Sequence, residues 1–274
     1  MTTTIGVFDS GFGGLTVLRE LLSLIPGAHY IYLGDTARLP YGSKSQATIA
    51  RYAVESARFL EARGVEQLVI ACNTASALAM PEIAAAVRIP VAGVIEPVVH
   101  ATQLRRPAAN TLILATAATV QSHAYRAACE AAGLQPTEKA CPLLVPLIEE
   151  GWIDHPVTRE VLRIYLREAL DVCSPEVVIL GCTHYPLIAP LVAETLGSLG
   201  STAEVIDSAQ ATARAVQLAL SQNGGPSPTP IAPTPIAPAT CEFFATDSVE
   251  KFARLGSAFL GQPVKNVQLL DLGG

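Results

Sequence analysis

The sequence predicts an α/β protein built on doubly wound parallel sheets, and three observations carry this prediction. Short apolar runs, each the length of one buried strand, alternate along the chain with longer amphipathic runs of helical period. Such alternation favours parallel strands covered by helices. Two of the apolar runs end on a cysteine followed by hydroxyl or amide residues, and the second half of the chain repeats the order of the first.

The first half alternates strands and helices. Strands are expected at residues 5–8, 29–33, 67–71 and 89–95, the last ended by Glu96-Pro97. Helices are expected at residues 15–24 and at about 44–63. This β-α-β-α-β order predicts a parallel sheet.

The second half restarts the pattern at residue 111. Strands are expected at residues 111–114, 177–181 and 205–206, and the segment 142–148 is interpreted as a strand or loop that ends in acids. Helices are expected through about residue 132, at 158–171 and from 208 to about 221; strand 242–244 and helix 249–260 follow. Residues 224–238 contain Pro-Thr-Pro-Ile-Ala twice in succession, which predicts an extended surface loop.

Composition excludes several classes of protein. Of the 274 residues only 15% are charged, the formal net charge is −6, and the longest basic cluster is Arg105-Arg106, so no nucleic-acid footprint is expected. Polar residues interrupt each apolar run before it reaches the length of a membrane span, and no secretory signal is expected. Six irregularly spaced cysteines predict reduced thiols in the cytoplasm, and no metal-ligand spacing is present.

Two loops of the first half carry candidate site residues. Asp9 opens a glycine-rich turn between strand and helix, where it would repel a phosphate, so it favours a group that polarises or moves a proton. Capping of the next helix is the alternative role. Tyr41, held between Pro40 and Gly42, is expected to present an exposed hydroxyl to a ligand.

Cys72 and Cys182 follow two buried strands, where the carboxyl ends of parallel strands form ligand sites. A helix N-terminus after each cysteine is expected to lower its pKa toward neutrality. His184, two residues after Cys182, is a candidate acid or base partner. Cys129, Cys141, Cys173 and Cys241 are expected to be inert core residues or incidental surface residues.

Two similar thiols suit the inversion of a stereocentre. A Cys-His hydrolase would leave one of the two cysteines unexplained. Inversion requires a base on one face of a carbon and an acid on the other, with the roles exchanged in the reverse direction. One thiolate and one thiol meet that requirement.

Five motifs of the chain, in their order, resemble those of glutamate racemase, in the cofactor-independent aspartate/glutamate racemase family. They are FDSGFGGLTV (8–17), LPYG (39–42), ACNTAS (71–76), VPLIEEG (145–151) and GCTHYP (181–186). The terminal FFAT (243–246) also resembles the family, whereas the proline-rich segment is outside its common pattern.

The resemblance implies interconversion of L- and D-glutamate without a cofactor or metal, supplying D-glutamate for peptidoglycan. It implies that Cys72 acts on the D-enantiomer, assisted by Asp9, and that Cys182 acts on the L-enantiomer, assisted by His184. Glu149 is the implied further acid, although its neighbour Glu150 leaves the choice open. The positions that match substrate-binding ones, besides Asp9 and His184, are Ser10, Tyr41, Gly42, Asn73, Thr74 and Thr183, with Thr119 a weaker candidate.

The resemblance also implies two pseudo-symmetric α/β domains with the active site in the cleft between them. The expected limits are residues 1–96 plus 208–274 for the first domain and 97–207 for the second. A homodimer is implied. The alternatives are an aspartate racemase or another two-cysteine racemase, and, in a different class, a binding or regulatory protein that kept the fold without catalysis.

Overall fold

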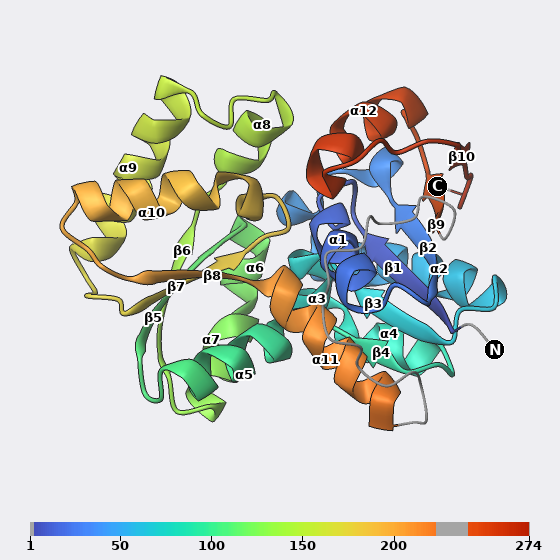
Figure 1. Ribbon diagram of the computed structural model, residues 1–274, viewed down its shortest axis with the longest axis horizontal. Helices are drawn as coiled ribbons and strands as arrows, with labels where there is room; N and C mark the ends of the chain where they lie inside the picture. The colour runs from blue at the N-terminus through green and yellow to red at the C-terminus, as the bar shows by residue number, and fades with distance from the viewer. Residues whose placement is uncertain (1–2, 223–240, 274) are drawn as a thin grey trace.

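Two parallel sheets, side by side, form the framework of the protein (Figure 1). The computed structural model describes residues 3–222 and 241–273. The predicted proline-rich loop, residues 224–238, lies outside the described residues. None of the helices in the described part of the chain is long and apolar enough to cross a membrane.

The first sheet has six strands in the order β10-β9-β2-β1-β3-β4, and every pairing in it is parallel. The strands are β1 (Thr4–Asp9), β2 (His29–Gly34), β3 (Gln67–Ile70), β4 (Val91–Ala92), β9 (Cys241–Ala245) and β10 (Val267–Leu269). Its helices are α1 (Leu15–Leu24), α2 (Gln46–Ala62), α3 (Asn73–Leu78), α4 (Met80–Ala86), α11 (Ser208–Gln222) and α12 (Val249–Leu260). The last strand and helix therefore return to the sheet with which the chain begins.

The second sheet has four parallel strands in the order β6-β5-β7-β8. They are β5 (Asn110–Ala115), β6 (Gln135–Ala140), β7 (Val177–Gly181) and β8 (Glu204–Asp207). Its helices are α5 (Ile95–Arg105), α6 (Ala117–Ser122), α7 (Ala124–Ala131), α8 (Leu144–Glu149), α9 (Pro156–Leu170) and α10 (Ala189–Ser198). Helices α5 and α7 pack together, as do α9 and α10, so the predicted doubly wound α/β class is confirmed.

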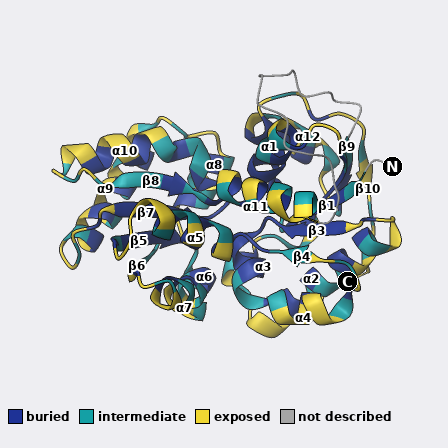
Figure 2. Cartoon of the chain, turned by 60° about the horizontal axis from the view of Figure 1, so that its bottom comes forward, coloured by how far each residue is buried: buried dark blue, intermediate teal, exposed yellow. Residues whose placement is uncertain are grey.

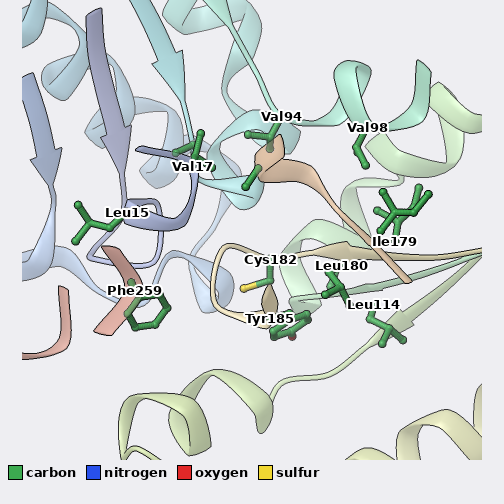
Figure 3. Packing of buried hydrophobic residues seen from close by; sticks show 14 of the residues in the cluster. Leu15, Val17, Val94, Val98, Leu114, Ile179, Leu180, Cys182, Tyr185 and Phe259 are labelled. Carbon is green, nitrogen blue, oxygen red and sulfur yellow. The ribbon is translucent and has the colours of Figure 1, made fainter. Parts of the chain in front are cut away.

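Alternate residues of the central strands enter different cores, as the period of a strand requires. Ile5 and Val7 of β1 belong to a core with α1 and α11, whereas Phe8 belongs to a second core beneath α2. The first core continues through Val94 and Val98 to Ile179 and Leu180 of β7, as Figure 3 shows. Buried strands and half-exposed helices are visible in Figure 2. Helix α11 packs on α1 and on α5, which ties the two sheets together.

Four expectations about secondary structure are wrong. The strand predicted at 89–95 is only Val91–Ala92, and Pro97 lies in the first turn of α5, where its missing N–H costs nothing. The segment 142–148 becomes helix α8, so its acids end a helix. The single helix expected through about residue 132 is broken at His123, which has a left-handed φ of 55°. Strands β6 and β10 were not predicted; both are partly exposed sheet edges without a continuous apolar run.

Candidate active site

The carboxyl ends of the central strands border a cavity of about 420 Å³ between the two sheets. Ser10 follows β1 and Cys72 follows β3 by two residues, while Thr116, Cys141 and Cys182 follow β5, β6 and β7. The wall comprises Ser10, 39–44, 72–74, 116–118, Gln121, Cys141, Pro142, Val145, Pro146, Glu149 and 182–184. Both halves of the chain therefore contribute to one site.

Cys72 caps helix α3 with its sulfur. The Ala75 N–H lies 3.4 Å from Cys72 Sγ, and the Ser10 hydroxyl oxygen lies 3.5 Å from the same atom. Cys72 is 4% exposed, so the thiol opens to the cavity but hardly to bulk water.

Cys182 lies directly after β7, and Figure 3 shows its sulfur directed away from Leu114 and Leu180. His184 Nδ1 is 3.9 Å from Cys182 Sγ and 3.4 Å from the Thr183 hydroxyl oxygen. Cys182 is 5% exposed, as is His184. The imidazole is therefore placed to exchange a proton with the thiol.

A chain of polar contacts fixes the His184 ring. Glu149 Oε1 lies 3.2 Å from His184 Nε2, and Lys251 Nζ lies 3.4 Å from Glu149 Oε2. Because an ionised carboxylate only accepts hydrogen bonds, Nε2 carries a hydrogen, and in the neutral form of the imidazole Nδ1 is then the acceptor facing Cys182. The rings of Phe12 and Phe259 lie 5.9 and 5.0 Å from the imidazole centre.

The two adjacent acids, Glu149 and Glu150, differ in their surroundings. Glu149 contacts His184 and lines the cavity, whereas Glu150 is exposed. Burial by itself would raise the pKa of Glu149, but the hydrogen bond and charge of His184, together with the charge of Lys251, lower it overall. Glu149 is therefore held as a carboxylate.

Asp9 is buried behind the cavity wall, with 1% exposure. Its Oδ2 accepts the Gly11 N–H at 3.0 Å, and its Oδ1 has no hydrogen-bond partner among the described residues. Burial raises the pKa of Asp9, with the charge of His184 acting in the opposite direction. The N-cap of α1 is Gly14, so Asp9 does not cap that helix.

The expectation that both thiols have lowered pKa values is wrong for the protein without a bound substrate. Burial raises the pKa of Cys72 to about 11, and the nearby Asp9 charge adds to the increase. Burial also raises the pKa of Cys182 well above its ordinary value. Desolvation outweighs the backbone N–H groups at the start of each helical segment. Each thiol therefore needs a neighbouring base to lose its proton.

A group of threonines covers the side of the cavity between the sheets. Thr74 Oγ1 lies 3.1 Å from Thr116 Oγ1 and 3.2 Å from Thr119 Oγ1. Thr119 is fully buried and does not line the cavity, whereas Thr74 and Thr116 do. Thr183 also lines it, and its carbonyl accepts the Thr16 hydroxyl at 3.2 Å.

Tyr41 lines the cavity, but the expectation of an exposed hydroxyl is wrong. Its side chain is 1% exposed, and its hydroxyl donates to Asp35 Oδ2 at 2.5 Å. Asp35 also accepts the Thr246 hydroxyl at 2.9 Å. The phenol thus anchors the loop, and both Tyr41 and Gly42 line the cavity. A Cβ on Gly42 would lie 3.1 Å from Thr116 Cβ, so the loop closely approaches the second half.

Several residues on the wall were missing from the predicted site, among them Thr116, Cys141 and Lys44. Thr116 could have been found, because it follows a predicted strand. Cys141, expected to be inert, lines the cavity because it follows the unpredicted β6; burial raises its pKa to about 12. Lys44, two residues after the LPYG motif, is the one lysine among the described residues that line the cavity.

The arrangement of these groups is suited to moving protons on a small anionic molecule. Two thiols, one from each sheet, line the same cavity, and each has its own buried acid or base nearby. Hydroxyl, amide and backbone groups from both halves surround the space between them.

Comparison with known proteins shows the family to which the chain belongs. Residues 5–216 match the family model described as Asp/Glu/Hydantoin racemase, so the chain belongs to that racemase family. A glutamate racemase from Koribacter versatilis is 50% identical over 287 residues, covering 98% of this chain and 98% of that protein.

Solved structures place the chain more narrowly. A glutamate racemase from Francisella tularensis, crystallised with D-glutamate, has a TM-score of 0.86 at 33% identity, covering 99% of this chain and 98% of the other. The Escherichia coli glutamate racemase, crystallised with L-glutamate and the activator UDP-MurNAc-ala, has a TM-score of 0.78 at 27% identity, with 100% of both chains covered. Within its family the chain groups with the glutamate racemases, which are isomerases.

Proposed function

We propose that this enzyme interconverts L- and D-glutamate without a cofactor, by two-base proton transfer between Cys72 and Cys182. The observation that carries the proposal is the pair of nearly buried thiols from the ends of β3 and β7, both on the wall of one cavity. The racemase family and the glutamate complexes of related structures support the substrate.

In the direction from L to D, the Cys182 thiolate removes the α-proton and the Cys72 thiol delivers a proton to the opposite face. The reverse direction exchanges these roles, so each turnover leaves one thiol protonated and the other ionised. The enzyme returns to its starting state through the reverse reaction or through proton exchange. No group outside the two thiols needs to accept a substrate proton permanently.

His184 and Asp9 are the proposed assisting groups. The free Nδ1 of His184 faces Cys182 at 3.9 Å and takes the thiol proton, while Glu149 stabilises the imidazolium that forms. Asp9 serves Cys72. Its raised pKa makes its carboxylate a stronger base than an ordinary aspartate, which reduces the unfavourable step from a thiol with a pKa of about 11.

The carbanion next to a carboxylate is the costly species, because nothing on the enzyme delocalises its charge. We assign substrate-carboxylate binding to Ser10, the Tyr41 and Gly42 backbone, Asn73, Thr74 and Thr183, with Thr116 added and Thr119 supporting it from behind. These groups are held before the substrate arrives, so their donors need little reorganisation as charge develops. Exclusion of water strengthens each of these contacts.

Incubation of the purified protein with L-glutamate in D2O, without added cofactor, tests the reaction. We expect loss of optical rotation together with replacement of the α-proton by deuterium. Cys72→Ser and Cys182→Ser should each abolish racemisation, and Cys129→Ser, at a buried thiol away from the cavity, should leave it intact. Response to aspartate but not glutamate would indicate an aspartate racemase, and response to neither would indicate a binding protein.

The remaining biological assignments rest on the family resemblance. We propose that the product D-glutamate enters peptidoglycan, and that the enzyme acts in the cytoplasm, whose reducing conditions keep both thiols free. We also propose a homodimer, with domain limits at residues 1–96 plus 208–274 and at 97–207. Sedimentation equilibrium of the purified protein tests the dimer.

A further inference from the structure

The amide of Asn73 has one atom bound by the protein and one atom free. Asn73 opens helix α3, lines the cavity and is 2% exposed. Its Oδ1 is 2.6 Å from the Tyr125 hydroxyl, whereas its Nδ2 has no hydrogen-bond partner among the described residues. A buried amide N–H without a partner is costly, so this donor is kept for something that enters the cavity.

Tyr125 reaches Asn73 from the other half of the protein. It lies in α7, which packs against β6 of the second sheet, while α3 follows β3 of the first sheet. Tyr125 is completely buried and does not line the cavity. The hydrogen bond between them therefore joins the two halves directly behind the site.

The phenol decides which end of the Asn73 amide has no hydrogen-bond partner among the described residues. An amide turned by 180° would place Nδ2 against the Tyr125 oxygen, and the phenol hydrogen would then lack an acceptor, since Asn73 is its hydrogen-bond partner in the described part of the chain. Burial raises the pKa of Tyr125 well above its ordinary value. The hydroxyl therefore keeps its hydrogen, and stays a donor, at any pH at which the thiols transfer protons. The turned amide would also present a carbonyl oxygen to an incoming carboxylate, which is repulsive.

We propose that Tyr125 is a positioning residue for racemisation: it holds the Asn73 amide so that Nδ2 donates to a carboxylate of the substrate. The inference rests on the proposed function for the identity of that carboxylate. Because the bond joins α3 and α7, the presentation of the donor depends on the relative position of the two halves.

Tyr125→Phe removes only the hydroxyl and keeps the packed ring. We expect KM for both glutamate enantiomers to rise about tenfold, with a smaller change in kcat, because the lost contact is made to the bound substrate as well as to the transition state. Tyr30→Phe is the matched control. Tyr30 is equally buried and its hydroxyl donates to the Leu21 and Ile25 carbonyls, but it is remote from the cavity, so KM should not change.

A double-mutant cycle separates positioning from general stabilisation. Glutamate dissociation constants are measured by calorimetry in a Cys182→Ser background, which prevents turnover, for Tyr125→Phe, Asn73→Ala and the combination. With Asn73 present, Tyr125→Phe should raise the glutamate dissociation constant about tenfold. In the Asn73→Ala protein, Tyr125→Phe should leave the dissociation constant unchanged. The inference is overturned if Tyr125→Phe weakens binding equally before and after the Asn73→Ala substitution. It is also overturned if Tyr125→Phe leaves KM unchanged in the otherwise native enzyme. Wild-type protein that does not racemise glutamate refutes the proposed function instead.

Discussion

Replacing Gly13 by alanine tests how closely the two halves must meet at the site. A Cβ on Gly13 would lie 2.3 Å from Thr183 Oγ1 and 2.6 Å from His184 Nδ1. Neither neighbour can move easily, because Thr183 and His184 are each 5% exposed and the imidazole packs against the rings of Phe12 and Phe259. The new methyl group must therefore displace the loop that carries Thr183 and His184 or separate the halves.

The overlap sets the size of the expected effect. Ordinary contacts of a Cβ begin at about 3.4 Å, so the loop that carries Thr183 and His184 has to retreat by roughly 1 Å. Misplacement on that scale lowers a reaction rate about 100-fold, while overpacking costs about 1–3 kcal/mol of stability. We expect Gly13→Ala to remain folded at 25 °C and to lose about two orders of magnitude in kcat.

Initial rates followed by optical rotation, with thermal unfolding of the same samples, measure both effects. Gly27→Ala is the control, because a Cβ there meets no atom within 4 Å and its φ is not positive. Its kcat should equal that of the wild type. A Gly13→Ala enzyme with wild-type kcat would refute the reasoning, because the loop would then tolerate the displacement that the geometry requires.

Three further outcomes follow from charged groups at the site. Glu149→Gln should lower kcat about 10- to 100-fold, because the imidazole of His184 loses the carboxylate that orients it. Steady-state kinetics in both directions measure kcat, and an unchanged kcat would count against this role of Glu149. The folded pKa of Glu149 is lower than its ordinary value of 4.5, so its contribution to stability is present above that pH and is lost as pH falls through the lower folded value. Urea unfolding of wild type and Glu149→Gln should thus give a stability difference near neutrality that shrinks on acidification, and a constant difference would contradict the sign. Lys44→Met should raise KM roughly fivefold at low salt, the equivalent of about 1 kcal/mol of charge attraction, and less at high salt; a salt-independent effect would exclude attraction of the substrate anion.

The position of the two thiols was predictable from the sequence. Buried parallel strands are continuous apolar runs, and the carboxyl ends of neighbouring strands share one edge of a sheet. Asp9 and Cys72 end such runs in the first sheet and Cys182 ends one in the second, so strand order places each group at the carboxyl edge of its own sheet. That the two edges border one cavity depends on how the two sheets pack. The motif resemblance then supplied the racemase family, which the sequence match confirms.

Other features depended on neighbours that are distant in the sequence. Glu149 rather than Glu150 reaches His184 because α8 is a helix, whose successive side chains point in different directions. Tyr41 turns inward toward Asp35, which accepts a hydrogen bond from its hydroxyl and another from the distant Thr246. Edge strands such as β6 carry no apolar run because they pair on one side only, and Cys141 was therefore not placed at the cavity.

The same division applies to the electrostatics. The sequence by itself determined which ionisable groups follow the strands, because each comes directly after an apolar run. Only the tertiary structure decided their proton affinities: packing of the two halves excludes water from Cys72, Cys182 and Asp9, and that desolvation raises all three pKa values. It also decided which atom of the Asn73 amide is free, since Tyr125 approaches from the opposite half of the protein.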